Sequence, residues 1–417
     1  MASVLVIGSG GREHAVVKAL KKSRHVDTIY CAPGNAGIEE DAICVPIEPL
    51  DFGKIINFLQ SHKDIAFTVA TPDNPLVAGI TDVLQEKGFR VFGPSKKAAM
   101  IEGSKIFAKK LMEKNGIPTA KYSYFTDYAD ALYYILQAQY PIVIKADGLA
   151  YGKGVKICTN FKDAENAVSA IMTEAVFGLN NRNILIEEML TGHEVSLLVF
   201  TDGKTFKLMP SAQDHKRIGD GDLGPNTGGM GAFSPSPFFT PMMLEKTIQR
   251  IIKPTINALN ADDCTFKGVL YFGLMICKSD PYVIEYNARF GDPETQAILP
   301  QLESDLYEIF DAVIDERLDE IDVKWSRGQA VSIVAASQGY PGSYTVGYPI
   351  TIDPDVTDVE IFHAGTKNID GELCTNGGRV LAVTAIASDM QASRSLAYNA
   401  LKKIKFKGMY YRYDIGK

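Results

Sequence analysis

The beginning of the chain holds the pattern that most restricts the fold. A short apolar run, Ser3–Ile7, is followed by the glycine-rich turn GSGG and then by a helical pattern over Ala15–Leu20. Further apolar strands are predicted at 28–31 and 65–70, with a helix at 51–62 between them. Strands and helices that alternate in this way favour a parallel, doubly wound sheet. The first part of the chain is therefore predicted to be an α/β domain.

The chain has 417 residues, which is too many for one hydrophobic core, because domains usually contain about 100–200 residues. We expect an α/β domain at 1–103, a helical linker at 104–122, a unit with a glycine-rich hairpin at 123–192, a central unit at 193–326 and a β-rich unit at 327–417. One helix is predicted from about 96 to 115, and another at 389–403. Residues 214–235 show no regular periodicity and are predicted to form a long functional loop.

The overall composition excludes several classes of protein. The net charge of −7 argues against non-specific nucleic-acid binding, which needs a basic surface. No segment approaches the roughly 20 apolar residues of a membrane span, and the first residues lack the basic start of a signal peptide. The six cysteines are scattered, which indicates free thiols rather than disulfides or a zinc site. We therefore expect a soluble cytoplasmic protein with no nucleic-acid or membrane partner.

The segment EYNARFGDPETQ, residues 285–296, contains the most unusual pattern. It follows the apolar run 282–284, and residues two apart in a strand share one face, so Glu285, Asn287 and Arg289 should point the same way. Carboxylate and amide oxygens are ligands that Mg²⁺ prefers, with phosphate oxygens completing the coordination shell. The sequence predicts a magnesium site at Glu285 and Asn287. A polar cluster satisfied by its own contacts is the alternative.

Two glycine-rich segments are candidates for phosphate binding. GSGGREH, residues 8–14, follows a strand and opens a helix, where backbone N–H groups can bind an anion. It is not a dinucleotide fingerprint, because the third glycine is replaced by Glu13; a plain tight turn is the alternative. KADGLAYGKGV, residues 145–155, is typical of loops that close over nucleotide phosphates, although it is not a Walker A motif.

Together these motifs resemble the ATP-grasp carboxylate–amine ligases. Lys105, Lys145, the glycine-rich hairpin, EEML at 187–190, Glu194 and the Glu-x-Asn of 285–287 occur in the order of that superfamily. GSGGREHA, PGNAG, DHKR, GPNTGGMGA and NARFGDPETQ resemble the phosphoribosylamine–glycine ligase family in particular, over essentially the whole chain. The resemblance implies an ATP-grasp fold with a Rossmann-like amino-terminal domain, a lid subdomain at 123–192, a central ATP-grasp subdomain at 193–326 and a small β-rich carboxyl-terminal domain.

The resemblance also implies a reaction and its ligands. ATP, glycine and 5-phosphoribosylamine would give glycinamide ribonucleotide, ADP and phosphate through a glycyl phosphate, an early step of purine synthesis, with Mg²⁺ or Mn²⁺ as cofactor. A mobile lid should keep the acyl phosphate from water, and no Ser-His or Cys-His nucleophile is required. We expect a monomer, with a dimer as the alternative.

The resemblance assigns roles to individual residues. The residues implied for ATP binding are Lys105, Lys145, Tyr151, Gly152, Lys153, Gly154, Val155, Lys156, Glu187, Glu188, Met189, Leu190 and Glu194. Those implied for the metal are Glu285 and Asn287, and those implied for the other substrates are Gly11, Arg12, Asp214, Arg289, Asp292 and Arg379, with Arg289, Lys145 and Asp292 as the catalytic group. Arg379 is expected to bind the ribosyl 5′-phosphate, and a surface arginine beside a turn is the alternative.

One position departs from the superfamily pattern. Many ATP-grasp enzymes carry an acidic metal ligand on the strand before the Glu-x-Asn motif, where this chain has Gly273. That difference leaves the metal to Glu285, Asn287, phosphate and water. Two other functions remain open at this point: a different ATP-grasp ligase, which RFGDPETQ disfavours, and a nucleotide-binding regulator, which would be expected to lose the lysine and glutamate ligands.

Overall fold

The computed structural model describes residues 2–150, 154–176 and 182–417. The amino-terminal part is a parallel sheet with the order β3-β2-β1-β4-β5, the order of a doubly wound fold. Its strands are β1 (Ala2–Gly8), β2 (Val26–Pro33), β3 (Ile43–Cys44), β4 (Ile65–Ala70) and β5 (Val91–Phe92). Its helices are α1 (Gly11–Lys21), α2 (Phe52–Ser61), α3 (Asp73–Ala78) and α4 (Ile80–Glu86). The predicted parallel sheet is present.

The single helix predicted from about 96 to 115 is wrong. The structure has two helices, α5 (Lys96–Gly103) and α6 (Lys105–Lys114), separated at Ser104. Ser104 adopts an extended conformation, and its hydroxyl accepts a hydrogen bond from the Phe107 backbone N–H at 3.1 Å, so it caps the second helix. The apolar pattern continues across Ser104, so the sequence pattern does not show that a new helix starts there.

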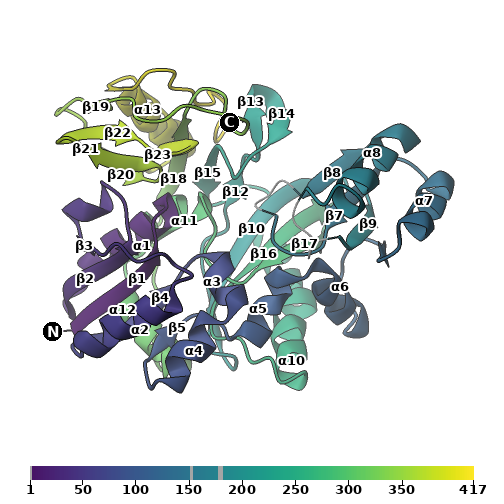
Figure 1. The fold of residues 1–417 in the computed structure, drawn as a ribbon, viewed down its shortest axis with the longest axis horizontal. Helices are drawn as coiled ribbons and strands as arrows, with labels where there is room; N and C mark the ends of the chain where they lie inside the picture. The colour runs from purple at the N-terminus through teal and green to yellow at the C-terminus, as the bar shows by residue number, and fades with distance from the viewer. Residues whose placement is uncertain (1, 151–153, 177–181) are drawn as a thin grey trace.

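Residues 122–188 form a separate antiparallel sheet, which projects to the right in Figure 1. Its order is β6-β9-β7-β8, built from β6 (Tyr122–Phe125), β7 (Ile142–Ala146), β8 (Val155–Cys158) and β9 (Ile184–Glu188). Helices α7 (Tyr128–Gln137) and α8 (Phe161–Met172) pack on it through a small apolar core of their own. This unit therefore has an apolar core separate from those of the other sheets.

A third sheet occupies the middle of the molecule. Its order is β11-β10-β16-β17, with β10 (His193–Thr201), β11 (Phe206–Leu208), β16 (Gly268–Cys277) and β17 (Asp280–Asn287). The helical segments α9 (Pro241–Thr247), η3 (Ile248–Ile252) and α10 (Lys253–Ala261) cover one face, and α12 (Leu306–Ile314) covers the other. The apolar cores on both faces are shared with the amino-terminal domain, which holds the two parts together.

Strand β17 contains a bulge that decides where its polar residues point. Gly273 pairs with Glu285, but Leu274 pairs with Val283, so Ile284 is an extra residue. Val283 and Tyr286 both face the apolar core, although strict alternation would put Glu285 on the face of Val283. Bulges re-aim side chains and are common beside active sites. Here the bulge turns Glu285 away from the core.

The carboxyl-terminal sheet has the order β12-β15-β18-β23-β20, and it lies above the amino-terminal domain in Figure 1. It consists of β12 (Gln213–Asp214), β15 (Gly231–Ser234), β18 (Gln329–Ala336), β20 (Glu360–His363) and β23 (Arg379–Ala387), covered by α13 (Met390–Leu401). Two of these strands come from the segment 214–235 or its edge. The prediction that this segment is an irregular loop is therefore wrong. The strands β13 (Arg217–Gly219) and β14 (Leu223–Asn226) also pair as a hairpin within it.

The remaining elements complete the chain. Short pairs are formed by β19 (Thr351–Ile352) with β24 (Ile404–Lys405) and by β21 (Thr366–Ile369) with β22 (Glu372–Thr375), and α11 (Glu294–Ile298) follows β17. All six cysteines are free thiols. Within the described residues, we find no helix of the length and apolarity that crossing a membrane requires.

Candidate active site

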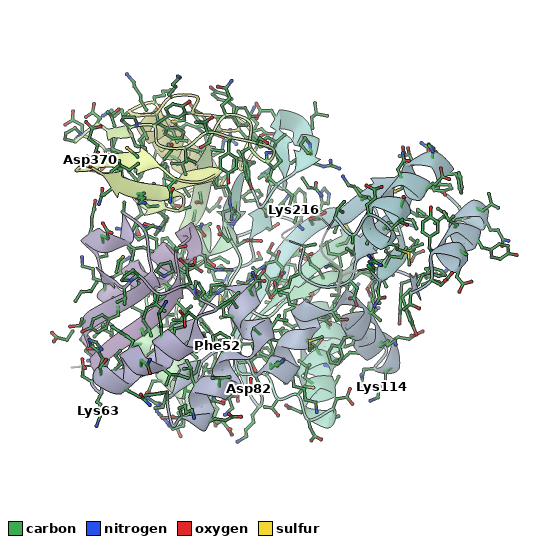
Figure 2. The ribbon with its side chains drawn as sticks, viewed as in Figure 1. Phe52, Lys63, Asp82, Lys114, Lys216 and Asp370 are labelled. Atoms are coloured by element: carbon green, nitrogen blue, oxygen red, sulfur yellow. The ribbon has the colours of Figure 1, made fainter. Side chains whose placement is uncertain are left out.

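A lysine that the sequence analysis did not single out joins two of the predicted site residues. The Lys216 ammonium lies 3.1 Å from the Glu194 carboxylate and 3.3 Å from the Glu285 carboxylate. It follows β12 and precedes the β13–β14 hairpin, and Figure 2 labels it near the middle of the molecule. Because Glu194 and Glu285 come from β10 and β17, Lys216 connects the edge of the central sheet to the long loop.

Residues beyond position 409 hold this loop in place. The Arg412 guanidinium is fully buried and donates to the Arg217 carbonyl at 2.9 Å and to the Asp222 carboxylate at 2.8 Å. The Tyr410 hydroxyl donates to the Ile218 carbonyl at 2.9 Å. The backbone next to Lys216 is thereby fixed by segments almost 200 positions later in the chain.

Three lysines set the charge state of Glu285. Lys216 acts most strongly, followed by Lys145 and Lys105, and together they lower the pKa of the Glu285 carboxyl from 4.5 to about 2 in spite of burial. Burial lowers the pKa of Lys105, opposed by Glu285. For Lys216, Glu194 and Glu285 outweigh burial and raise its pKa well above the ordinary value. Glu285 is therefore a carboxylate at any physiological pH.

Glu285 and Asn287 fit a divalent cation. The bulge brings both side chains to the open side of β17, where Glu285 is about one-third exposed, and the Asn287 carbonyl oxygen accepts from Arg289 at 3.1 Å. A charged carboxylate and an amide oxygen are hard oxygen donors of the kind Mg²⁺ prefers. Opposite Glu285 stands Gly273, where a Cβ atom would lie 2.7 Å from the Glu285 Cγ atom. The glycine thus makes room for Glu285, and an acidic ligand at 273 would displace it.

Lys145 and Lys105 lie beside the glycine-rich hairpin, as the sequence suggested. The Lys145 ammonium lies 2.9 Å from the Glu187 carboxylate and donates to the Ile284 carbonyl at 2.9 Å. The Lys105 ammonium donates to the Gly148 carbonyl at 2.8 Å. Of the hairpin residues, Gly154 is buried, and its carbonyl oxygen accepts a hydrogen bond from the Ala146 N–H at 2.9 Å. Val155 and Lys156 begin β8, and Tyr151, Gly152 and Lys153 lie outside the described residues.

The remaining residues predicted for the nucleotide lie along one strand edge. Glu187 is almost fully buried and its carboxylate contacts two lysines, so any contact of this residue with a nucleotide must come from its backbone. Glu188 is exposed at the end of β9, and its carboxylate accepts from the Lys121 N–H at 2.9 Å. Met189 and Leu190 follow it, both half-buried. This edge leads directly to Glu194.

A cavity of about 300 Å³ opens between the amino-terminal turn and the carboxyl-terminal domain. It is lined by Ser9, Gly10, Gly34, Asn35, Asp292, Tyr340, Ala364, Gly365, Thr366, Asn376 and Arg379. Arg379 donates to the Asp292 carboxylate at 2.8 Å and to the carbonyls of Gly228 and Asp292 at 2.6 and 2.9 Å. Burial would raise the pKa of Asp292, but Arg379 and Arg12 lower it. Arg379 is thus not a free surface arginine.

Other predicted substrate residues lie around this cavity without lining it. Gly11 packs so closely on Gln296 that a Cβ atom would lie 2.6 Å from its amide nitrogen. Arg12 is buried, 2.6 Å from the Glu13 carboxylate, and donates to the Phe290 carbonyl at 3.3 Å. The neighbouring residues Ser9 and Gly10 line the cavity instead.

Two further predicted site residues, Arg289 and Asp214, are half-buried. Arg289 lies 2.8 Å from the Glu102 carboxylate of α5, and its Nε atom is buried with no hydrogen-bond partner among the described residues. The Asp214 Oδ1 atom is likewise buried and unpartnered there. Burial, and then the charge of Glu294, raise the pKa of Asp214 well above its ordinary value. Glu294 itself accepts from Ser196 and Tyr271 at 2.9 and 3.0 Å.

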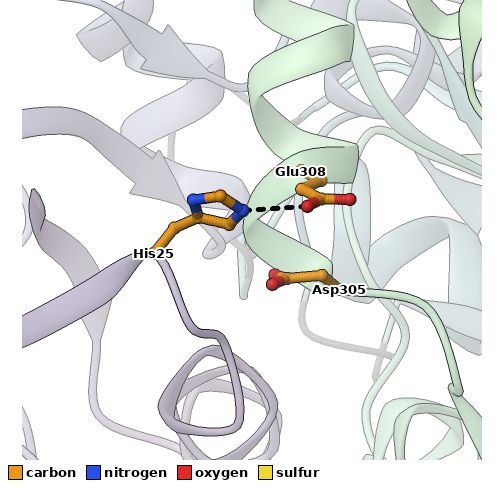
Figure 3. A group of neighbouring side chains, drawn as sticks. All are labelled: His25, Asp305 and Glu308. Carbon is orange, nitrogen blue, oxygen red and sulfur yellow. Dashed lines mark hydrogen bonds and ion pairs between the residues drawn. The ribbon is translucent and has the colours of Figure 1, made fainter. Parts of the chain in front are cut away.

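A separate group of metal-ligand side chains, His25, Asp305 and Glu308, is shown in Figure 3. Its carboxylates already have partners. Asp305 caps α12 by accepting from the Tyr307 N–H at 2.9 Å and also accepts from Ser23 at 2.9 Å, while Glu308 accepts from His25 at 2.8 Å and from Arg24 at 2.9 Å. A cation would compete with Arg24, so this group bridges β2 and α12 and is not a metal site.

Sequence reasoning missed Lys216 and Lys109, and it gave Glu294, inside the motif 285–296, no role of its own. The only signal for Lys216 was its place in DHKR, inside a loop without periodicity. Lys109 looks like an ordinary lysine on a helix, and Glu294 like an ordinary residue of a helix start. Their importance comes from tertiary contacts, which no local pattern encodes.

The arrangement of sheets around this site is shared with proteins of known structure. The biotin carboxylase domain of the 2-oxoglutarate carboxylase from Hydrogenobacter thermophilus superposes with a TM-score of 0.74 at 16% identity, covering 98% of this chain and 91% of that chain. That likeness concerns the fold alone. A family model described as "Phosphoribosylglycinamide synthetase, ATP-grasp (A) domain" matches residues 103–295. The chain is therefore an ATP-grasp protein.

Models of the N domain and the C domain of the same family match residues 2–102 and 330–417. Phosphoribosylamine–glycine ligases from Caldanaerobacter subterraneus subsp. tengcongensis and Halalkalibacterium halodurans are both 46% identical to the chain and cover 99% of it, over 99% and 96% of their own lengths. A crystal structure of phosphoribosylamine–glycine ligase from Thermotoga maritima matches with a TM-score of 0.85 at 34% identity, covering 99% of this chain and 100% of that chain. The chain belongs to the phosphoribosylglycinamide synthetase family, and the predicted fold class is confirmed.

Proposed function

We propose that the chain is an ATP-dependent ligase that joins glycine to 5-phosphoribosylamine and so makes glycinamide ribonucleotide for purine synthesis. The observation that carries this proposal is the continuity of the segment 285–292. It begins at Glu285, which faces three lysines, and ends at Asp292, which lines the 300 Å³ cavity. A phosphate-transfer site and a pocket for a second substrate are thereby joined by one short stretch of chain. The names of the relatives agree with this function.

In the first step, a glycine carboxylate oxygen attacks the γ-phosphorus of ATP, and the bond from that phosphorus to ADP breaks. Phosphoryl transfer depends mostly on positioning and on stabilising negative charge. Lys105, Lys145 and Lys216 supply positive charge around Glu285, which suits the polyphosphate. Arg289 lies beside Asn287 with an unpartnered Nε atom, and we assign it to the glycine carboxylate or the transferred phosphoryl group.

The ATP-grasp fold implies a divalent cation, and Glu285 with Asn287 would hold it. The fit rests on a carboxylate that three neighbouring lysines keep charged. Mg²⁺ or Mn²⁺ would neutralise phosphate charge and orient the phosphates. Only two protein ligands are proposed, which agrees with the habit of Mg²⁺ to take its other ligands from phosphate and water.

In the second step, the amine nitrogen of phosphoribosylamine attacks the carbonyl carbon of glycyl phosphate, phosphate leaves and the nitrogen loses a proton. The ribosyl phosphate would occupy the cavity lined by Gly10, Asp292 and Arg379. There the backbone N–H groups of the glycine-rich turn and the Arg379 guanidinium suit a phosphate. Asp292 and Asp214 are the proposed partners of the amine or the hydroxyl groups, and we assign Gly11 and Arg12 to the same substrate although they lie behind the residues that line the cavity.

The nucleotide itself would lie between the lid sheet and the central sheet. We assign the phosphates to Lys105, Lys145 and the hairpin 151–156, the adenine to the strand edge 187–190, and the ribose hydroxyls to Glu194. The boundaries 1–103, 104–122, 123–192, 193–326 and 327–417 stay predictions, as do a monomeric state and a cytoplasmic location. Chromatography with light scattering would measure the mass in solution.

The reaction can be tested by measuring ADP release. The chain, MgATP and glycine should release ADP rapidly only when phosphoribosylamine is generated in the same solution, and the product should have the mass of glycinamide ribonucleotide. Formate and bicarbonate in place of glycine serve as controls for other ATP-grasp ligases. A rate of ADP release that does not depend on glycine or on phosphoribosylamine would contradict the proposal.

A further inference from the structure

Lys109 of α6 is a lysine in an unusual place, because its side chain is only 2% exposed. Its ammonium donates to the Thr119 hydroxyl at 2.7 Å and to the Ala120 carbonyl at 3.2 Å. It also lies 3.2 Å from the Glu187 carboxylate. Burial lowers the pKa of Lys109 to about 8, opposed by Glu187, so the side chain is mostly charged at neutral pH. Burying a charge is costly unless it is paired, and this lysine therefore calls for an explanation.

Glu187 is shared between two lysines. One of its oxygens lies 3.2 Å from Lys109, and the other lies 2.9 Å from Lys145. All three side chains are nearly buried, with exposures of 2, 3 and 10% for Lys109, Glu187 and Lys145. Two positive charges and one negative charge give this triad a net charge of +1. With Glu187 and Lys145 alone, the buried group would be neutral.

The triad also touches the strand that carries the proposed metal ligand. Lys145 donates to the Ile284 carbonyl at 2.9 Å, which is the bulge residue directly before Glu285. Thr119, which receives the Lys109 hydrogen bond, donates to the Val283 carbonyl at 2.7 Å. Lys109 thus lies behind the proposed phosphate site, out of reach of a ligand, and acts through its neighbours.

We propose that Lys109 is a positioning residue for the proposed nucleotide site: it shares Glu187 with Lys145, so the carboxylate does not fully neutralise the Lys145 ammonium, and positive charge remains to attract the anionic phosphates. The inference rests on the proposed function. It assigns to a residue that touches no substrate the task of keeping a buried charge group positive. A merely structural lysine would affect folding stability but would not discriminate between ligands by their phosphate charge.

The test uses Lys109→Met, which keeps the side-chain length and removes the charge. Equilibrium binding of Mg–ADP and of adenosine is measured for the full chain. Loss of the positive charge behind the proposed phosphate site should weaken Mg–ADP binding about fivefold to tenfold, because a lysine charge and phosphate charges attract each other through the protein. Adenosine, which has no phosphate, should bind with unchanged affinity. Lys110→Met is the matched control, because Lys110 is the exposed neighbour on the same helix, and it should bind both ligands like the wild type.

A second variant separates charge from structure. Lys109→Met combined with Glu187→Gln returns the triad to a net charge of +1, so Mg–ADP affinity should recover to within about twofold of the wild type. If the double variant binds Mg–ADP more weakly than Lys109→Met, or if Lys109→Met weakens ADP and adenosine equally, the inference is wrong. Unchanged Mg–ADP binding by a folded Lys109→Met variant would also overturn it. Failure of the wild type to bind Mg–ADP would instead refute the proposed function itself.

If Lys109→Met fails to fold, the binding of Mg–ADP is measured for the single variant Glu187→Gln instead. That change raises the net charge of the triad to +2, and Mg–ADP binding should become tighter or stay equal. Weaker binding would mean that Glu187 serves the nucleotide in its own right, and the inference would fail.

Discussion

The two halves of the proposed site neutralise their charges in opposite ways. Around the phosphate side, four lysines face three glutamates: Lys105, Lys109, Lys145 and Lys216 against Glu187, Glu194 and Glu285. Around the cavity, each arginine has its own acid: Arg12 with Glu13, Arg289 with Glu102, and Arg379 with Asp292. Among these residues the lysines outnumber the glutamates by one, whereas the three arginine–acid pairs are balanced.

The difference teaches how each half can recognise an anion. Lysine is a compact point charge on a flexible stem, whereas the arginine guanidinium is a rigid fork that holds a defined geometry. A lysine group with excess charge attracts a polyphosphate whatever its exact pose. Paired arginines instead build a shaped wall, and a phosphate there gains from hydrogen bonds more than from net charge. Changes of charge should therefore be felt most on the lysine side.

The largest expected effect comes from Glu285→Gln, which removes the acid that three lysines surround. Mg²⁺ binding needs the negative charge of the carboxylate, and glutamine has the same shape but no charge. Turnover at saturating MgATP should fall by at least about a hundredfold, roughly 2.7 kcal/mol in the barrier, and far-ultraviolet circular dichroism should be unchanged. Glu86→Gln, at an exposed helix position, is the control. Near-normal turnover in saturating Mg²⁺ would remove Glu285 from the metal site.

Lys216→Met should have the next largest effect, because it takes the bridging cation from Glu194 and Glu285. We expect kcat/KM for ATP to fall about ten- to a hundredfold, the range of one charge-assisted hydrogen bond. Binding of glycinamide ribonucleotide should change little, because Lys216 does not line the cavity. Equal losses of affinity for ATP and for glycinamide ribonucleotide, measured by calorimetry, would contradict the proposed difference between the two halves of the site.

Arg379→Ala probes the paired half. The substitution removes the partner of Asp292 and one wall of the cavity, so affinity for glycinamide ribonucleotide should fall about tenfold. Affinity for ADP should stay within experimental error. Arg379→Lys should recover only part of the loss, because a point charge cannot replace the fork that spans Asp292 and the Gly228 carbonyl. A loss of ADP affinity alone would show that the assignment of Arg379 to the ribosyl phosphate is wrong.

The smallest effect concerns the dependence of stability on pH. The pKa of Glu285 is lowered from 4.5 to about 2 on folding. A lowered carboxyl pKa stabilises the fold above the unfolded value, and that stabilisation disappears as the pH falls through the folded value. The contribution of Glu285 should therefore be constant above about pH 4.5 and decline below it, by much less than the ideal slope of about 1.4 kcal/mol per pH unit, because the side chain is about one-third exposed and solvent screens its interactions. The gap in unfolding free energy between wild type and Glu285→Gln, followed by urea titration at successive pH values, measures this; a gap that widens on acidification would contradict the assignment.

Sequence patterns located the strands that carry the site but not the contacts that tune it. The apolar run 282–284 lies in β17, the strand that carries Glu285 and Asn287, and the parallel amino-terminal sheet follows from its alternation of strands and helices. The extra residue Ile284, which re-aims Glu285, leaves no local signal, because a bulge depends on the register of the partner strand. The pairing of Arg379 with Asp292 spans 87 positions and has no signature in either motif.

The bulge at Ile284 has a consequence for how the gene can tolerate change. Many substitutions of single residues along β17 would leave the strand register intact. Loss of the Ile284 codon would remove the extra residue, and regular alternation would then leave Val283 and Tyr286 on the core face and Glu285 on the opposite face. Every residue of the motif Glu-x-Asn-x-Arg would still be encoded in order. An in-frame deletion at that one codon would therefore preserve the face that each motif residue occupies, and it would remove the Ile284 carbonyl that accepts from Lys145 at 2.9 Å.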